Sequence, residues 1–243
     1  MECIYTKSKA LSAVPTSFCP GCMHGTAIKL IAEVSEELGI ENDLVMVAPI
    51  GCAVFLGAFV EFDSFGSPHG RPGATGTGFK RSNPDVPLIL YQGDGDCASI
   101  GLAETMHAAN RGENFTVIMI NNQVYGMTGG QAAPTTLPGQ KTTTSPAGRS
   151  IEGSGYPIQL AELIASFKAP KYVTRQSLHT PKNVLAAKKA IKKALEIQIN
   201  EGGYSYVELM SACPTNWKMD PKDTPKYMED VVLKEFPVGD LKG

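Results

Sequence analysis

Three short runs of apolar residues constrain the fold of this chain more than any other feature. They span residues 44–50, 87–92 and 116–120, and polar or glycine residues flank each of them. Such runs, with hardly a polar side chain, are typical of strands that are buried on both faces of a sheet. Residues 98–111 form a helix-length segment between the second and the third run. A strand, a helix and a strand in succession predict a parallel sheet.

The rest of the chain continues this alternation. Apolar residues at helical spacing run from Thr26 to Leu38, and the Gly39 that follows can take the left-handed conformation that often ends a helix. Further along we expect, in order, a helix, a strand, a helix and a strand at residues 158–167, 172–174, 183–200 and 204–210. The pattern predicts an α/β fold with a doubly wound, mostly parallel sheet.

Two segments do not follow the alternation. Residues 125–156 are rich in Gly, Thr and Pro, and we expect either a long ordered loop or a partner-binding segment there. Residues 218–243 are expected to form a peripheral C-terminal extension to one domain that spans residues 1–217. A chain of 243 residues that is 42% hydrophobic is large enough to bury a single core of this kind.

Charge and apolar content argue against several classes of protein. With a net charge of -2, the chain has no basic surface that would hold nucleic acid. Its N-terminal residues lack the apolar stretch of a signal peptide, and no run approaches the roughly 18 apolar residues of a membrane span. We therefore expect a soluble, cytoplasmic protein. In that reducing compartment its 6 cysteines suit metal or redox chemistry better than disulfides.

The motif Gly-Asp-Gly-Asp at residues 93–96 begins where the run 87–92 ends. In an open parallel sheet, ligands bind beyond the carboxyl ends of the strands; glycines there admit a phosphate, and an aspartate offers a hard oxygen to a divalent cation. The next strand ends in two asparagines, which would bring the Asn122 amide near the Asp94 carboxylate. Either motif alone is better explained as a tight turn. Together they predict one ion that bridges two phosphates.

Four cysteines are placed where they could share a metal centre. Cys19 and Cys22 have the spacing of a zinc half-site, a redox dithiol or an iron–sulfur half-site. Cys52 and Cys213 each follow a predicted strand, so both thiols should lie at the same edge of the sheet as the phosphate motif. This dispersion favours a 4Fe-4S cluster over structural zinc, whose ligands usually come as two close pairs. The remaining two are expected to be free or buried thiols: Cys3 and Cys97.

Several segments together resemble one known family. In chain order they are FCPGCMHG (18–25), IGC (50–52), SPHGRPGATGTGFKR (67–81), YQGDGD (91–96), INNQVYGMTGGQAAPTT (120–136) and SACPTNW (211–217). They resemble the thiamine diphosphate-binding β subunit of the 2-oxoacid:ferredoxin oxidoreductases, and most closely the 2-oxoisovalerate branch. The resemblance extends over nearly the whole chain up to residue 217 and implies the thiamine diphosphate-binding fold.

The resemblance also implies cofactors and the residues that hold them. Mg²⁺ is expected on the Asp94 carboxylate, the Asn122 amide and the Val124 backbone carbonyl. The 4Fe-4S cluster is expected on Cys19, Cys22, Cys52 and Cys213. Thiamine diphosphate is expected against Ile50, Gly51, Cys52, Ala53, His69, Gly93, Gly95, Asp96, Gly126, Met127 and Thr128. Without the family pattern, His69 would be taken for a surface loop residue. No catalytic base is assigned, because the family's activating glutamate lies on a partner subunit.

The implied activity is oxidative decarboxylation of a 2-oxoacid to acyl-CoA and CO₂, with electrons passing through the cluster to ferredoxin. The implied partners are an alpha subunit, gamma and delta subunits where the enzyme has them, ferredoxin, coenzyme A and a small 2-oxoacid. Nucleic acid and membranes are not expected as partners. Met127 stands where pyruvate-using relatives commonly carry asparagine, which favours a bulkier, branched substrate such as 2-oxoisovalerate.

Other interpretations compete with this one. The nearest is the same chemistry on 2-oxoglutarate or pyruvate. The second is a non-oxidative thiamine diphosphate decarboxylase or ligase subunit with structural zinc, although such enzymes usually carry both halves of the thiamine site on one long chain. The third is a zinc-stabilised binding module, which would leave the two strand-end motifs unexplained.

Overall fold

A computed structural model of the chain describes residues 5–243, so Cys3 lies outside the described part. The strands of its main sheet are β1 (Val45–Ala48), β2 (Asp63–Gly66), β3 (Leu88–Gly93), β4 (Thr116–Asn121), β7 (Tyr172–Ser177), β8 (Ser205–Met210) and β9 (Gly239–Lys242). They lie in the order β2-β1-β3-β4-β8-β7-β9. Every neighbouring pair of strands is parallel except β7 and β9, which are antiparallel. The predicted mostly parallel sheet is confirmed.

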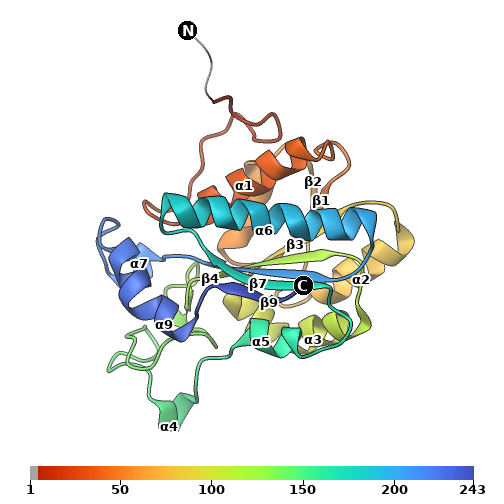
Figure 1. Cartoon of the computed structure of the whole chain (residues 1–243). Helices are drawn as coiled ribbons and strands as arrows, with labels where there is room; N and C mark the ends of the chain where they lie inside the picture. Colours follow the sequence, from red (N-terminus) through yellow and green to blue (C-terminus); the bar gives the residue numbers. More distant parts are fainter. Residues whose placement is uncertain (1–4) are drawn as a thin grey trace.

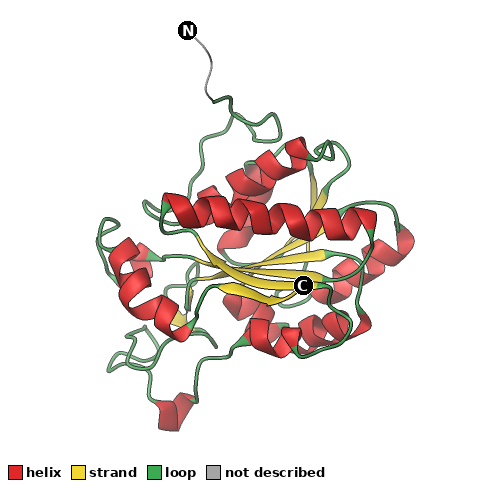
Figure 2. Cartoon of the chain, in the orientation of Figure 1, coloured by secondary structure: helices red, strands yellow, loops and turns green. Residues whose placement is uncertain are grey.

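Helices cover both faces of this sheet, as a doubly wound fold requires (Figure 1). One face carries α1 (His24–Glu37) and α6 (Pro181–Asn200), and the other carries α2 (Pro72–Ser82), α3 (Leu102–Arg111) and α5 (Leu160–Ala165). The shorter elements are η1 (Cys52–Ala58), η2 (Asp96–Ile100), β5 (Val124–Tyr125), β6 (Gln131–Ala132), α4 (Ile151–Ser154), α7 (Pro214–Trp217), α8 (Thr224–Tyr227), η3 (Met228–Val232) and α9 (Leu233–Glu235). Figure 2 shows that long loops join several of them at one end of the sheet.

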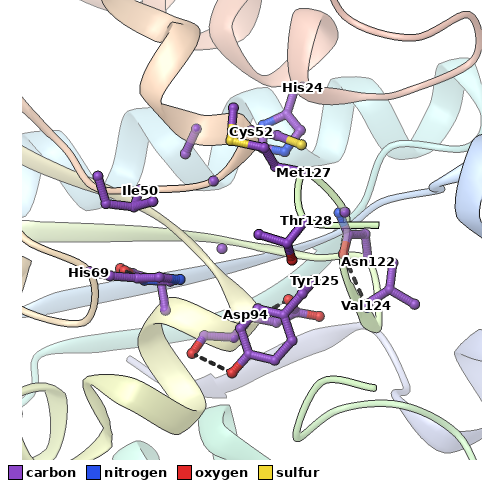
Figure 3. A pocket seen from close by; sticks show the side chains of 16 residues that line it. His24, Ile50, Cys52, His69, Asp94, Asn122, Val124, Tyr125, Met127 and Thr128 are labelled. Atoms are coloured by element: carbon purple, nitrogen blue, oxygen red, sulfur yellow. Dashed lines mark hydrogen bonds and ion pairs between the residues drawn. The ribbon is translucent and has the colours of Figure 1, made fainter. Parts of the chain in front are cut away.

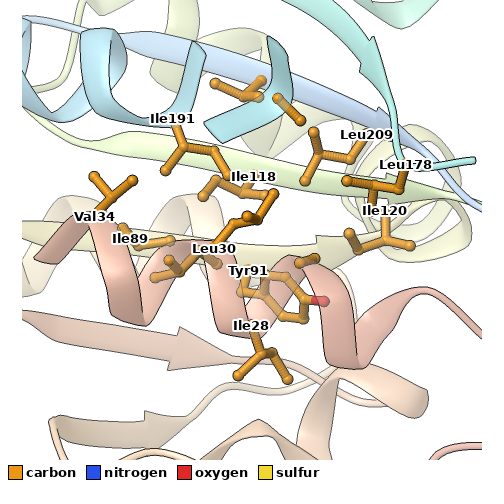
Figure 4. Close-up of a cluster of buried hydrophobic side chains, with 14 of the residues drawn as sticks. Ile28, Leu30, Val34, Ile89, Tyr91, Ile118, Ile120, Leu178, Ile191 and Leu209 are labelled. Carbon is orange, nitrogen blue, oxygen red and sulfur yellow. The ribbon is translucent and has the colours of Figure 1, made fainter. Parts of the chain in front are cut away.

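The apolar runs form strands because successive side chains alternate between two buried layers. Side chains of β3 and β4 that point toward α1 and α6 join one cluster, part of which Figure 4 shows: Ile89, Tyr91, Ile118 and Ile120. Their neighbours point to the opposite face and join a second cluster: Leu88, Leu90, Val117 and Met119. Strands in this central part of the sheet therefore need apolar residues at nearly every position.

Strand β2 and helix α2 are among the elements that were not predicted from the sequence. The residues of β2 are mostly exposed and carry no apolar run. Helix α2 contains three glycines, which are poor helix formers. At least one of them has a packing reason, since a Cβ on Gly76 would lie 2.6 Å from the Leu90 side chain of β3. The helix thus approaches the sheet too closely for an ordinary side chain.

The C-terminal residues 218–243, expected to be a peripheral extension, are packed into the fold. Strand β9 adds to the edge of the sheet beside β7. Met228, Val232 and Phe236 are fully buried in the same cluster as α1 and α6. This segment therefore contributes core contacts as well as a sheet edge.

Candidate active site

The pocket of interest lies where the direction of winding reverses. Strand β2 follows β1 in the chain and lies on one side of it, whereas β3 lies on the other side. At such a reversal the loops after the two strands separate and leave a crevice in which α/β proteins bind ligands. Figure 3 shows this pocket, whose walls come mainly from the residues that follow β1, β3 and β4, with His69 after β2 and His24 at the start of α1.

The pocket brings together all the positions that the resemblance assigns to the cofactor and to magnesium. Its lining residues are His24, Ile50, Gly51, Cys52, Ala53, His69, Gly93, Asp94, Gly95, Asp96, Asn122, Val124, Tyr125, Gly126, Met127 and Thr128. Two of them, His24 and Tyr125, were not predicted. The binding roles of the others stay predictions, but their spatial association is now established.

Asp94 is held rigidly at the end of β3. Its carboxylate oxygen Oδ1 accepts a hydrogen bond from the Gly95 N–H at 2.8 Å. Its Oδ2 accepts from the Gln123 N–H at 2.7 Å and from the Thr135 hydroxyl at 2.7 Å. Burial raises the pKa of Asp94 to about 6, although these hydrogen bonds oppose the rise. A cation beside this carboxylate would favour the charged form.

The turn after β4 presents Asn122 to the pocket. Gln123, the next residue, has a φ of 60°, a left-handed conformation that is uncommon outside glycine. The Asn122 side-chain oxygen accepts only a long hydrogen bond, 3.3 Å, from the Val124 N–H. Its backbone oxygen accepts a hydrogen bond from the Trp217 indole N–H at 3.0 Å. The amide oxygen thus retains capacity to bind a ligand.

Asp96, predicted to lie against the diphosphate, also lines the pocket, and its oxygens contact protein donors. Its Oδ1 accepts from His69 Nδ1 at 2.5 Å and from the Gly70 N–H at 2.6 Å. Its Oδ2 accepts from the Gln92 side chain at 2.7 Å. The carboxylate therefore orients the His69 ring at the pocket wall (Figure 3).

The four predicted cluster cysteines gather beside this pocket. The pKa of Cys22 is raised to about 12, first by burial and then by the charges of Cys213, Cys52 and Cys19. Burial, followed by the charges of Cys213 and Cys19, raises the pKa of Cys52 to about 11. Such mutual effects require the four sulfurs to be near one another. Within residues 5–243, no three His, Cys, Asp or Glu side chains are close enough to hold a single ion.

Cys97 is separate from this group, in line with its expected role as a buried thiol. Its side chain is fully buried on the opposite face of the sheet from α1. Its sulfur lies 3.5 Å from the Thr105 hydroxyl. Burial raises the pKa of the Cys97 thiol well above its usual range.

Gly126 lies between the thiols and the pocket. A Cβ at this position would be 3.4 Å from the Cys52 sulfur and 3.7 Å from the Cys213 sulfur. Helix α7 holds the same region, because the Asn216 side chain donates to the Gly126 carbonyl at 3.0 Å and to the Cys213 sulfur at 3.2 Å. No side chain at position 126 therefore separates the two halves of the site.

His24 is the most informative residue that the sequence did not single out. It is buried behind the pocket, with Nδ1 2.7 Å from the Tyr91 hydroxyl and its ring stacked on Phe18. Burial lowers the pKa of His24 to about 4, so the imidazole is neutral near pH 7. The signal was present, since His24 lies within the FCPGCMHG segment that carries the resemblance.

Residues 50–209 match the family described as thiamine pyrophosphate enzyme, C-terminal TPP binding domain. All pocket residues except His24 fall within this range. The match defines the class of the protein: the chain carries a thiamine pyrophosphate-binding domain. Among the described residues, no helix combines the length and apolar character that a membrane crossing needs.

Comparison with individual proteins identifies the family within this class. The chain is 46% identical, over 98% of its length, to ketoisovalerate oxidoreductase subunit VorA of Methanothermobacter thermautotrophicus. It is 36% identical, over 93% of its length, to 2-oxoglutarate synthase subunit KorB of Methanothermobacter marburgensis, and covers 77% of that relative. The chain also resembles a solved structure, 2-oxoglutarate:ferredoxin oxidoreductase from Magnetococcus marinus with 2-oxoglutarate, coenzyme A and succinyl-CoA bound. The two superpose with a TM-score of 0.78 at 28% sequence identity, and the match covers 94% of this chain and 74% of that chain.

The chain therefore belongs to the 2-oxoacid:ferredoxin oxidoreductase family, as a subunit of the thiamine pyrophosphate-binding type. The predicted family and fold are confirmed. The chain spans 50% of the length of the VorA relatives that it matches.

Proposed function

We propose that this chain is the β-type subunit of a 2-oxoacid:ferredoxin oxidoreductase and holds thiamine diphosphate, Mg²⁺ and a 4Fe-4S cluster. One observation carries the proposal: the Asp94 and Asn122 turns and the thiols of Cys52 and Cys213 meet around Gly126. An oxygen site for a diphosphate and a sulfur site for a redox centre are thus placed side by side. Free cysteines at all five described positions are compatible with the reducing, cytoplasmic location predicted from the sequence.

The oxygen donors suit Mg²⁺ and a diphosphate. Asp94 supplies a carboxylate, Asn122 an amide oxygen and Val124 a backbone carbonyl, which are all hard ligands. Mg²⁺ is usually held by one or two carboxylates together with substrate phosphates, and here Asp94 supplies one carboxylate. Gly93, Gly95 and Gly126 line the pocket without side chains, so that a phosphate can approach the backbone.

The sulfur donors suit an iron–sulfur cluster. Four thiols are the usual ligand set of a 4Fe-4S cluster, which is larger than one ion and accepts ligands that stand further apart. The Asn216 side chain already donates a hydrogen bond to the Cys213 sulfur. Hydrogen bonds of this kind stabilise a negatively charged cluster and tune its potential.

When bound, thiamine diphosphate supplies the electron sink for decarboxylation of a 2-oxoacid, with the cluster as the outlet for electrons toward ferredoxin. The tasks of this chain are to hold the diphosphate and its cation, to keep a neutral His24 and an Asp96-oriented His69 at the pocket wall, and to fix the thiols. We assign no base to this chain and propose that an alpha subunit supplies the activating glutamate. Gamma or delta subunits and coenzyme A complete the proposed assembly.

We propose a branched-chain substrate such as 2-oxoisovalerate. Met127 lines the pocket and is 43% exposed, so an apolar side chain faces the space beside the cofactor site. The relatives of 46% and 45% identity are named ketoisovalerate oxidoreductase subunits. The alternative is 2-oxoglutarate, favoured by relatives at 34–37% identity that are named 2-oxoglutarate synthase subunits.

The test is to purify the native assembly anaerobically, measure iron, sulfide, magnesium and thiamine, and assay ferredoxin reduction with coenzyme A. We expect a brown protein with broad absorbance at about 400 nm, because iron–sulfur charge transfer absorbs there. Initial rates should rank 2-oxoisovalerate above 2-oxoglutarate and pyruvate. A colourless, zinc-loaded protein would contradict the cofactor assignment, and a preference for 2-oxoglutarate would contradict the substrate.

A further inference from the structure

The segment after β6 contacts the candidate metal carboxylate across a wide sequence separation. Thr135, which is fully buried, donates its hydroxyl to Asp94 Oδ2 at 2.7 Å. The adjacent Thr136 donates its hydroxyl to the Gln123 carbonyl at 2.6 Å. Two successive threonines therefore hold Asp94 and the Asn122–Gln123 turn from one side.

Arg149 fixes the turn that carries these threonines. Its Nη1 donates to the carbonyls of Ala133, Pro134 and Thr136 at 2.7 to 3.1 Å. Its Nη2 donates to two more carbonyls further along the chain, those of Ser154 and Tyr156. The side chain is only 7% exposed, so a buried cation is here solvated by backbone carbonyls. Such an arrangement costs desolvation energy and serves to make the 133–136 turn rigid.

The hydrogen bonds decide which oxygen of Asp94 is left for a cation. A carboxylate offers about four lone-pair sites, two on each oxygen. The Gln123 N–H and the Thr135 hydroxyl both donate to Oδ2 at 2.7 Å. The Gly95 N–H donates to Oδ1 at 2.8 Å, and the Asn122 backbone also donates to the carboxylate. The two short hydrogen bonds to Oδ2 make Oδ1 the oxygen better able to bind a cation.

We infer that Thr135 is a positioning residue: its hydroxyl, on a turn that Arg149 holds, donates to Asp94 Oδ2 and fixes the carboxylate in the orientation in which it would bind the cation. The inference rests on the proposed function, because it concerns the Mg²⁺ of the thiamine diphosphate site. Partners that orient a metal-binding carboxylate typically change metal affinity by about 10- to 100-fold when removed.

The experiment measures Mn²⁺, a paramagnetic substitute for Mg²⁺, in the native assembly with thiamine diphosphate present. The electron paramagnetic resonance signal of free Mn²⁺ gives the dissociation constant. Thr135→Val keeps the shape of the side chain without the hydroxyl and should raise this constant by about 10- to 100-fold. Thr135→Ser restores the hydroxyl and should restore the affinity. Arg149→Lys, which cannot bridge five carbonyls, should weaken Mn²⁺ binding by a smaller factor.

Thr116→Val is the matched control, since Thr116 is a fully buried threonine at the opposite end of β4 that donates to the Ala194 carbonyl. It should lower the melting temperature and leave Mn²⁺ affinity unchanged. An unchanged Mn²⁺ affinity in Thr135→Val would overturn the inference, and if that variant does not fold, an unchanged affinity in Arg149→Lys would overturn it. If the wild-type assembly shows no Mn²⁺ binding that depends on thiamine diphosphate, the proposed function itself fails.

Discussion

The oxygen half and the sulfur half of the site differ in how far they are prepared for their ligands. In the oxygen half, Asp94 accepts hydrogen bonds from Gly95, Gln123 and Thr135. In the sulfur half, burial and mutual repulsion raise the pKa of Cys22 to about 12 and of Cys52 to about 11. The fold therefore presents a fixed ligand for a hard cation but protonated thiols for the cluster. Metal binding has to drive proton release in the second half.

The largest expected effect comes from breaking the sulfur half. Cys52→Ser removes one of four proposed ligands and should abolish both the iron content and ferredoxin reduction. Cys97→Ser is the matched control, because that thiol is buried away from the other four. Iron analysis and visible absorbance of the two variants provide the measurement. Equal iron content in both would show that Cys52 is no ligand.

The next effect comes from breaking the oxygen half. Asp94→Ala removes the only carboxylate among the three proposed magnesium ligands. Because orienting partners alone are worth about 10- to 100-fold in metal affinity, loss of the ligand should cost at least about 100-fold. Calorimetric titration with thiamine diphosphate and Mg²⁺ measures it. The iron content should stay at the wild-type level, so retained diphosphate affinity or lost iron would contradict the division into two halves.

The difference between the two halves can also be tested through the pH dependence of thiol reactivity. Because burial raises the pKa of Cys52 to about 11, the thiolate fraction at pH 8 is about 100-fold lower than for a thiol with a pKa of 9. Alkylation of cluster-free protein by iodoacetamide should therefore be slow at Cys52 and should accelerate about tenfold per pH unit up to about pH 10. Mass spectrometry after timed quenching measures it, with protein unfolded in urea as the reference. A pH-independent rate would refute the raised pKa.

The smallest effect concerns the hydrogen bond from Asn216 to the Cys213 sulfur, 3.2 Å long. In the proposed cluster this hydrogen bond would stabilise the more negative, reduced form, so its removal in Asn216→Leu should lower the reduction potential. A hydrogen bond worth about 1 kcal/mol corresponds to about 40 mV for one electron. Spectroscopic redox titration measures this shift, and a potential that rises would contradict the assignment.

The sequence predicted those elements whose apolar side chains are buried and missed elements that bury few of them. The runs that became β1, β3 and β4 were visible because both faces of each strand are buried. Strand β2 and helix α2 were not, because their residues are exposed or are glycines selected by close packing. Periodicity reports burial, and elements with little burial of side chains give no periodic signal.

The site residues that directly follow a strand could be predicted from the sequence. Asp94 and Asn122 follow apolar runs, so parallel topology alone placed them together. Thr135 and Arg149 were missed because the segment 125–156 has no periodicity, and nothing in its composition shows that Thr135 touches a residue 41 positions away. The cofactor and magnesium positions assigned by resemblance line the pocket, whereas their binding roles await the experiments above.

Strand β8 lies in the middle of the sheet, between β4 and β7, yet it is the last of the parallel strands to be synthesised. Cys213 and Trp217 follow it, whereas Cys19 and Cys22 precede the first helix. At about 5–20 residues per second, the N-terminal thiols leave the ribosome on the order of 10 to 40 s before their partner. If these thiols bind the proposed cluster, its insertion can be completed only after β8 has taken its place in the sheet, and a delay in that step would leave the N-terminal thiols exposed to oxidation.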